Sequence, residues 1–190
     1  MGYYSEQYNK TVDEILAEIR TALTAVDPDT AEALVNEILK AEKVFFIGVG
    51  RVMLSLSAFA KRLAHLGISA HCVGDITEPA ITDKDLLIVG SGSGSTIFPL
   101  GIVKKAKSLN ARVAHIGSNP ESLMAEYEDL FVRVPVRTKE YREDEIDSIQ
   151  PMTSLFEQTL LLLGDTIAKM MIDEQQIDMK SLWRYHANLE

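Results

Sequence analysis

The chain is poor in cysteine and in positive charge. Cys72 is the single cysteine among 190 residues, so no disulfide can form within the chain, and a reducing compartment is the simplest setting. Lysine and arginine together number 19, against 28 acidic residues, which gives a formal net charge of −9. Because nucleic-acid binding requires clustered positive charge, this composition argues against a nucleic-acid partner.

Long apolar runs and metal-binding patterns are also missing. The longest run, LLLLG near residue 160, is far too short to span a membrane. The N-terminal MGYYSEQYNKTVDEIL is polar and lacks the apolar centre of a signal peptide. The four histidines have no metal-ligand spacing with cysteine or acidic residues. We therefore expect a cytoplasmic protein with no membrane contact, no metal and no cofactor.

The patterns that are present predict one α/β domain over residues 1–190. Residues 1–42 carry apolar side chains at helical spacing and predict two helices, the second capped by Asp29 or Thr30. Strand and helix patterns then alternate over residues 43–137. Residues 151–190 predict a long helix, from about Met152 to Asp173, and a tail.

The alternating region predicts a layered architecture. Its five strand segments are mainly apolar instead of alternating regularly with polar residues, which is typical of parallel strands covered on both faces. We expect a three-layer α-β-α sandwich with a five-stranded parallel sheet. PESLMAEY, at 120–127, predicts a short helix. The charged stretch RTKEYREDEIDSIQ, at 137–150, predicts a lid or a subunit contact.

Three glycine-containing turns follow strands and are expected at the carboxyl edge of the sheet, where open α/β folds bind ligands. They are GVGR at 48–51, GSGSGST at 90–96 and GSNP at 117–120. The first could begin a dinucleotide-binding motif, with Asp75 as the acid that contacts the ribose. However, the third glycine of that motif would fall at Met53, whose large side chain would crowd the helix against its strand.

The second turn is better explained by a phosphate monoester. Ser91, Ser93 and Thr96 can donate hydroxyl hydrogens, and the start of the following helix adds backbone N–H groups. A P-loop would need Gly-Lys-Ser/Thr, but no lysine follows before Lys104. The plainer alternative is a flexible turn made of serine and glycine.

These residues resemble a known family. IVGSGSGST before a helix is similar to the S-x-S-G-x-T phosphosugar loop of the sugar isomerase (SIS) domain family. More narrowly, the chain resembles the 6-phospho-3-hexuloisomerases of that family. The matching segments run from about residue 44 to the last residue and include GVGR, FAKRLAHLG, VGDITEPAI, PMTSLFEQT and the terminal HANLE.

The resemblance implies a fold, an activity and an assembly. It implies a flavodoxin-like SIS fold and the interconversion of 3-hexulose 6-phosphate and fructose 6-phosphate, a step of the ribulose monophosphate pathway. It also implies a homotetramer with active sites at subunit interfaces. Two alternatives stay open: a non-catalytic phosphosugar sensor with the same pocket, and an isomerase of another sugar phosphate.

Site residues follow from the same resemblance. Glu157 would be the base that moves a proton between neighbouring sugar carbons, His186 its acid partner, and His65 a reserve candidate. Each has a plainer interpretation: an acid favoured by a helix N-terminus, an exposed tail histidine and a packing residue. His71 and His115 lie on predicted strands, and we expect structural roles for them.

The phosphate and substrate contacts are expected around the glycine turns. Arg51 could bind a phosphate through two N–H groups, with a surface ion pair as the plainer alternative. The complete set is Gly50, Arg51, Ser91, Ser93, Ser95, Thr96 and Ser118.

The chain also departs from the family pattern. Val52 and Met53 replace the usual Ser-Gly, and Ser95 replaces the usual glutamate. One hypothesis is that Glu78, in a neighbouring turn, supplies the missing carboxylate.

Overall fold

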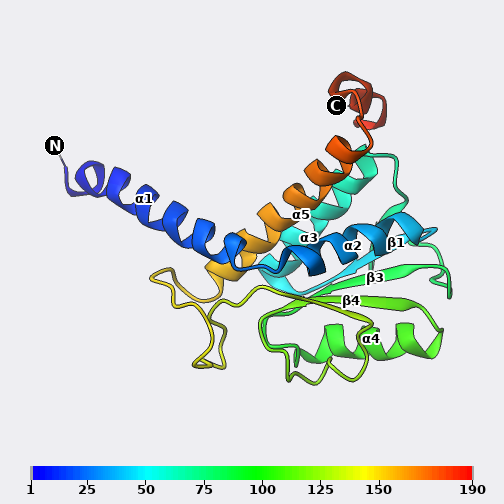
Figure 1. The fold of residues 1–190 in the computed structure, drawn as a ribbon, viewed down its shortest axis with the longest axis horizontal. Coiled ribbons are helices and arrows are strands. Elements are labelled where there is room, and N and C mark those ends of the chain that lie inside the picture. The colour runs from blue at the N-terminus through cyan, green and yellow to red at the C-terminus, as the bar shows by residue number, and fades with distance from the viewer. Residues whose placement is uncertain (1, 190) are drawn as a thin grey trace.

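The structure, a computed structural model, describes residues 2–189 (Figure 1). Met1 and Glu190, the last residue of the HANLE segment, lie outside the described residues. The elements in chain order are α1 (Tyr3–Thr24), α2 (Pro28–Lys40), β1 (Val44–Ile47), α3 (Gly50–His65), β2 (Ala70–Cys72), β3 (Leu86–Gly90), α4 (Ile97–Ser108), β4 (Arg112–Gly117), β5 (Leu130–Arg133), α5 (Ser154–Glu174) and the 3₁₀ helix η1 (Met179–Tyr185).

The five strands form one parallel sheet in the order β2-β1-β3-β4-β5. In its register, Phe46 of β1 lies opposite Cys72 on one side and Ile88 on the other. The strand order reverses between β1 and β3, and in such sheets this is the point where ligands bind. The predicted α/β fold with a five-stranded parallel sheet is confirmed.

Helices cover both faces of the sheet and make three layers (Figure 1). On one face, Phe46 and its neighbours pack against α2, α3 and α5 in the larger apolar cluster. On the other face, Phe45 and its neighbours pack against α4. β1 and β3 are buried along their whole length, as apolar strands between two helical layers must be.

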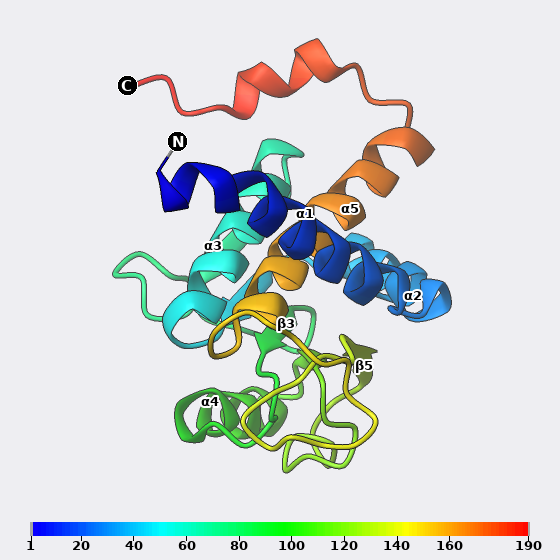
Figure 2. The same ribbon diagram turned by 90° about the vertical axis from the view of Figure 1, so that its left-hand side faces the viewer.

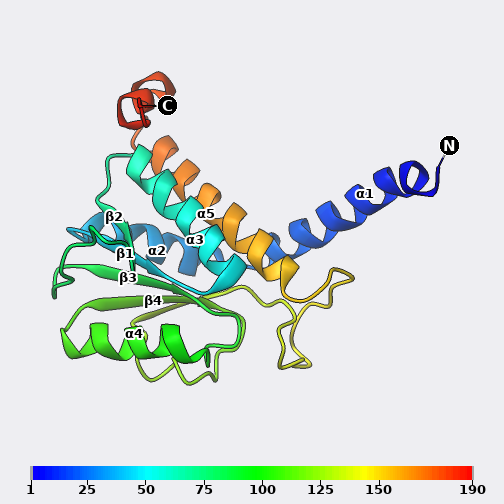
Figure 3. The ribbon, with the colours of Figure 1, turned by 180° about the vertical axis from the view of Figure 1, so that it is seen from behind.

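Helices α3 and α5 run side by side from the sheet to η1 (Figures 1 and 3). They are parallel, because Ser55 contacts Glu157 near their beginnings and Arg62 contacts Asp165 further along. Gly164 permits the close approach: a Cβ atom there would lie 2.7 Å from Cγ of Phe59. Both helices therefore begin at the carboxyl edge of the sheet.

Helix α1 projects away from the body of the molecule (Figures 1 and 3). Its contact with the rest includes Glu18, which accepts hydrogen bonds from the Ser148 hydroxyl at 2.8 Å and from the Ile149 N–H at 2.6 Å. Through Glu18, α1 is attached to the long connection between β5 and α5, whose course is clearest in Figure 2.

Two local predictions were wrong. Residues 120–127 form successive turns instead of a helix, because Asn119 Oδ1 and Ser122 Oγ accept hydrogen bonds from the Glu121 and Met124 amides. Side-chain acceptors of this kind compete with helix formation. Helix α2 is capped by Asp27, not by Asp29 or Thr30, because Pro28 is already its first residue.

Within residues 2–189, no helix combines the length and the apolarity needed to cross a bilayer.

Candidate functional site

Three helices begin at the carboxyl edge of the sheet, after the three predicted turns or beside them. They are α3 at Gly50, α4 at Ile97 and α5 at Ser154. Within the described residues, none of the three has a side-chain cap on its free N–H groups. Uncapped helix N-termini attract anions through these N–H groups and through the helix dipole. The edge is therefore suited to a negatively charged ligand.

Residues 91–96, called the serine loop below, place four hydroxyl groups before α4. Ser91 Oγ lies 3.3 Å from Thr96 Oγ1, and the Ser95 hydroxyl donates to Ser93 Oγ at 3.1 Å. Ser91 and Ser93 are buried, whereas Ser95 and Thr96 are half-buried. Because hydroxyl hydrogens rotate, each of these groups can turn from its neighbour to an anion.

The serine loop lies next to the beginning of α5. A Cβ atom on Gly92 would lie 2.9 Å from Cγ2 of Thr138 and 3.8 Å from the Phe156 ring. Phe156 immediately precedes Glu157, so the loop packs against the turn of α5 that carries this carboxylate. Glycine at position 92 allows the neighbouring chain to approach this closely.

Glu157 is buried and its carboxylate is held on both oxygens. Arg51 Nε donates to Oε2, and the Thr153 hydroxyl donates to Oε1 at 2.8 Å. The Ser55 hydroxyl donates to the Glu157 backbone oxygen at 2.8 Å and fixes α5 against α3. The Arg51 side chain is 66% exposed, so its remaining N–H groups face the solvent side of the pair. The site thus presents a buried carboxylate beside an exposed guanidinium.

Gly50 and Ser118, the two other predicted binding residues, differ from the serine loop in exposure and in hydrogen bonding. Gly50 is exposed, with a φ of +56°, which lets the chain turn from β1 into α3. Ser118 is fully buried, and its hydroxyl donates to Glu145 at 2.9 Å. The Ser118 hydrogen is therefore already engaged, so this residue is a weaker candidate for a phosphate contact than the serine loop.

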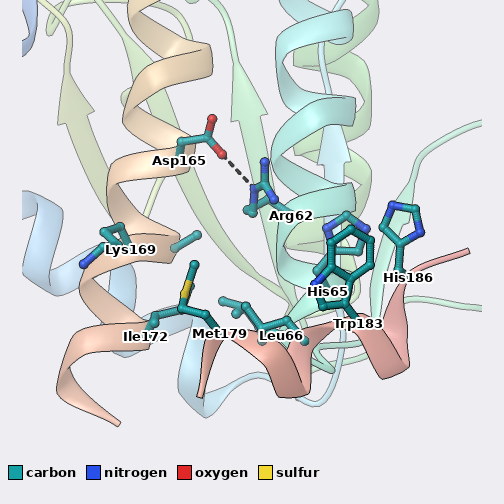
Figure 4. Close-up of a pocket in the computed structure, with 11 residues that line it drawn as sticks. Arg62, His65, Leu66, Asp165, Lys169, Ile172, Met179, Trp183 and His186 are labelled. Carbon is teal, nitrogen blue, oxygen red and sulfur yellow. Dashed lines mark hydrogen bonds and ion pairs between the residues drawn. The ribbon is translucent and has the colours of Figure 1, made fainter. Parts of the chain in front are cut away.

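The two other predicted catalytic residues lie at the far end of the α3–α5 pair (Figure 4). The rings of His65 and His186 stack with centroids 5.4 Å apart, and Trp183 lies 5.1 Å from His186. They line a groove of about 580 Å³ between α3, α5 and η1. Burial, followed by the charges of Lys61 and Arg62, lowers the pKa of His65 below 6.5.

Within one chain, the structure separates these histidines from Glu157. His65 follows Arg51 by fourteen positions in the same helix, which corresponds to roughly 21 Å along α3. The predicted catalytic set is therefore divided between the two ends of one helix pair.

Glu78 does not reach the serine loop. Its carboxylate accepts from the Gly74 N–H at 2.5 Å and lines a small cavity that also includes Lys105. Lys105 lies roughly 12 Å along α4 from Ile97, where the serine loop meets the helix. The hypothesis that Glu78 replaces the carboxylate missing at Ser95 therefore finds no support in the fold of one chain.

Sequence reasoning missed Thr153 and Glu145. Thr153 stands at the N-cap position of α5, four residues before Glu157, and this spacing could have indicated it. Glu145 accepts hydrogen bonds from the Ser118 and Thr138 hydroxyls and from two backbone N–H groups. The sequence gives no signal for Glu145, because it lies in a charged loop among several other acidic residues.

Fold and site together define an α/β protein that presents a hydroxyl-rich loop, suited to an anion, near a buried carboxylate. The chain belongs to the SIS domain family, whose model matches residues 37–164.

Relatives similar to this chain are known from bacteria. A 3-hexulose-6-phosphate isomerase of Bacillus subtilis is 40% identical over 179 residues, which cover 94% of this chain and 97% of that protein. The protein of the same name from Mycobacterium gastri is 37% identical over 173 residues, covering 91% and 86%.

A solved structure is similar as well. A protein from Methanococcus jannaschii, whose crystal structure was reported to infer a molecular function of 3-hexulose-6-phosphate isomerase, superposes with a TM-score of 0.82. It is 31% identical, and the match covers 95% of this chain and 99% of that one.

Proposed function

We propose that this protein is a phosphosugar isomerase that interconverts 3-hexulose 6-phosphate and fructose 6-phosphate. One juxtaposition carries the proposal: the serine loop, which suits a terminal phosphate, packs against Phe156 at the beginning of α5, and the next residue along that helix is the buried carboxylate Glu157. The names of the relatives from Bacillus subtilis and Mycobacterium gastri support the choice of sugar.

The reaction moves a carbonyl group from C3 to C2 of a six-carbon chain. A base takes the proton from C2, and the electrons of that bond form an enediolate across C2 and C3. The proton of the C2 hydroxyl is transferred to the C3 oxygen, and a proton returns to C3, which leaves the carbonyl at C2. Glu157 is the proposed base, and a carboxylate within hydrogen-bond reach suffices for this step. Arg51, which has further N–H groups beyond its contact with Glu157, is proposed to bind the substrate anion and hold it beside the base.

The proposed phosphate contacts are the serine loop and the beginning of α4. Ser91, Ser93, Ser95 and Thr96 supply hydroxyl groups, and Gly50 leaves the approach to Arg51 open. Ser118 is proposed to position the loop without donating to the phosphate, because its hydroxyl hydrogen is bound to Glu145.

A second copy of the chain is proposed to complete the site, within a homotetramer. His65 and His186 cannot reach Glu157 of their own chain, but His186 of the partner subunit could approach it as the acid. Exposed apolar side chains stand at both ends of the helix pair: Leu54, Ile97 and Met152 near the serine loop, and Trp183 beside His186. Such exposed apolar groups are typical of surfaces that another chain covers.

The remaining parts of the proposal concern organisation. Residues 1–190 are proposed to form a single SIS domain, with a helical segment over 1–42, an α/β core over 43–137 and C-terminal helices and tail over 151–190. The protein is proposed to act in the cytoplasm, in the ribulose monophosphate pathway.

The direct test is to incubate purified protein with fructose 6-phosphate in deuterium oxide. We expect 3-hexulose 6-phosphate to form and deuterium to enter at C2 and C3. Exchange without that product would indicate another sugar phosphate as the substrate. Binding without exchange would contradict an isomerase and favour a sensor.

The subunit arrangement is tested by complementation. Glu157→Gln and His186→Gln should each be inactive, and their mixture should regain activity after subunit exchange, because some interfaces then combine an intact Glu157 with an intact His186. No recovery in verified mixed oligomers would contradict a site shared between chains.

A further inference from the structure

His115 lies fully buried in β4, directly beneath the serine loop. In the sheet it is placed between Val89 of β3 and Phe131 of β5, whose ring centroid lies 5.1 Å from that of His115. Its Nε2 atom is 2.9 Å from the Ser91 backbone oxygen, and its Nδ1 atom is 2.7 Å from Oε2 of Glu128. His115 therefore makes two specific polar contacts in addition to packing in the core.

The hydrogen-bond roles follow from the partners. A backbone carbonyl oxygen can only accept, so Nε2 carries a hydrogen and donates it to Ser91. The carboxylate of Glu128 also accepts, so either Nδ1 carries a second hydrogen or Glu128 itself holds one. In both cases Glu128 fixes the ring orientation and keeps Nε2 as the donor.

The surrounding backbone is shaped around this ring. A Cβ atom on Gly117 would lie 2.4 Å from His115 Nε2 and 2.8 Å from the Ser91 oxygen. A Cβ atom on Gly94, which has a φ of +59°, would lie 3.0 Å from His115 Cε1. Glycine at both positions thus makes the contact between His115 and Ser91 possible.

The contact decides which way the loop backbone faces. The Ser91 oxygen accepts from His115 and from the Gly94 N–H, and the Gly92 oxygen accepts from the Ser118 and Asn119 N–H groups. Both carbonyl oxygens, which would repel an anion, are therefore drawn into the protein. The hydroxyl groups and the uncapped beginning of α4 are left on the ligand side.

We propose that His115, oriented by Glu128, is a positioning residue that holds the Ser91 carbonyl away from the phosphate and so sets the anion affinity of the serine loop. The proposal rests on the proposed function only in taking the serine loop as the phosphate site. It assigns His115 no contact with the substrate and no part in the proton transfer.

Two variants of the same residue test this. In His115→Gln, the side-chain amide nitrogen can take the place of Nε2 and donate to Ser91. In His115→Asn, the shorter side chain can meet Glu128 but cannot reach Ser91. His71→Gln is the matched control, because His71 is also a strand histidine but lies on the edge strand β2.

The measurements are the Kd for inorganic phosphate, by calorimetry, and KM and kcat with fructose 6-phosphate. For His115→Asn we expect Kd and KM to rise about tenfold, the value of roughly one hydrogen bond, with kcat changed less than about threefold. His115→Gln and His71→Gln should stay within about threefold of the unsubstituted protein. Equal losses in the Asn and Gln variants, unchanged affinity in the Asn variant, or a loss confined to kcat would each overturn the proposal.

A second measurement does not require the variants and therefore applies even if they fail to fold. In the unsubstituted protein labelled with ¹⁵N-histidine, saturating inorganic phosphate should shift the His115 signals and leave those of His71 unchanged. Unmoved His115 signals would overturn the proposal. The isomerase proposal fails separately: if the protein binds phosphate without isomerising fructose 6-phosphate, the Kd series still decides the role of His115. If it isomerises fructose 6-phosphate without binding inorganic phosphate, the KM series decides that role.

Discussion

Arg51 and Glu157 form an ion pair although 106 residues separate them in the chain. The pair joins the first turns of α3 and α5 at the carboxyl edge of the sheet. Only the Glu157 side is buried. This asymmetry lets the arginine turn toward a ligand while the carboxylate keeps its place, held by Thr153.

Replacement of Glu157 by glutamine should remove the base and preserve the fold, because glutamine can still contact Arg51 and Thr153. We expect kcat with fructose 6-phosphate to fall by about 10² to 10⁴, with little change in KM. Initial rates and solvent deuterium exchange measure the effect. A kcat within about threefold of the unsubstituted value would assign the base to another group.

Replacement of Arg51 by glutamine should weaken substrate binding. A charge-assisted contact to phosphate is lost, so we expect KM to rise about tenfold or more. The melting temperature should change little, since an ion pair with one exposed partner adds little stability. Arg112→Gln is the matched control: Arg112 also pairs with a glutamate, Glu37, but at the opposite edge of the sheet. Equal KM changes in both variants would contradict a role in binding.

Two helical glycines should respond to alanine in opposite directions. At Gly164, the new Cβ would meet Phe59 at 2.7 Å and push α5 from α3, and we expect a loss of about 1–3 kcal/mol in the free energy of unfolding. At Gly101 in α4, nothing lies within 4 Å, and we expect a gain of about 0.5–1 kcal/mol. Urea denaturation measures both. A stabilised Gly164→Ala variant would show that the two helices can separate without cost.

His65 should make the fold sensitive to mild acid. Burial and nearby positive charges lower its pKa in the folded protein below the value of 6.5, so the unfolded chain binds more protons as the pH falls through this range. The contribution of neutral His65 to stability is therefore present above 6.5 and is lost as the pH falls toward the folded-state pKa. Between about pH 7.5 and about pH 5.5, His65→Gln should lose less stability than the unsubstituted protein. Equal losses would contradict this account.

Much of the fold was predictable because its signals are local. Strand segments that are mainly apolar, without regular polar alternation, indicated a parallel sheet covered on both faces, and the structure has this sheet. Gly67 has a φ of +83° just after α3, and a glycine in this position is a common local signal for the end of a helix. The turns at 120–127 were missed because Asn119 and Ser122 use their side chains to bind backbone amides, an effect that apolar spacing does not show.

The candidate site was predictable in its parts but not in its geometry. The serine loop is one continuous segment, and its hydroxyl groups could be expected to lie together. By contrast, the contacts of Glu157 with Arg51 and Ser55 depend on how α5 returns to the sheet. The contact of His115 with Ser91 likewise depends on the pairing of β3 and β4. The distance of His65 and His186 from Glu157 within one chain could not be predicted. The motifs that carry these residues do not show at which end of the α3–α5 pair each of them lies.

The mutual bonds of the four serine-loop hydroxyls have a consequence for selectivity. Ser91 is paired with Thr96, and Ser95 with Ser93, so each loop oxygen has a neutral partner within the protein. An unphosphorylated sugar could offer only another neutral hydroxyl in exchange and would gain almost nothing. A phosphate replaces the neutral partner with a charged one, and the stronger bond favours the exchange. In the proposed phosphate site, this hydrogen-bond exchange would by itself favour phosphorylated over free sugars, without a gate.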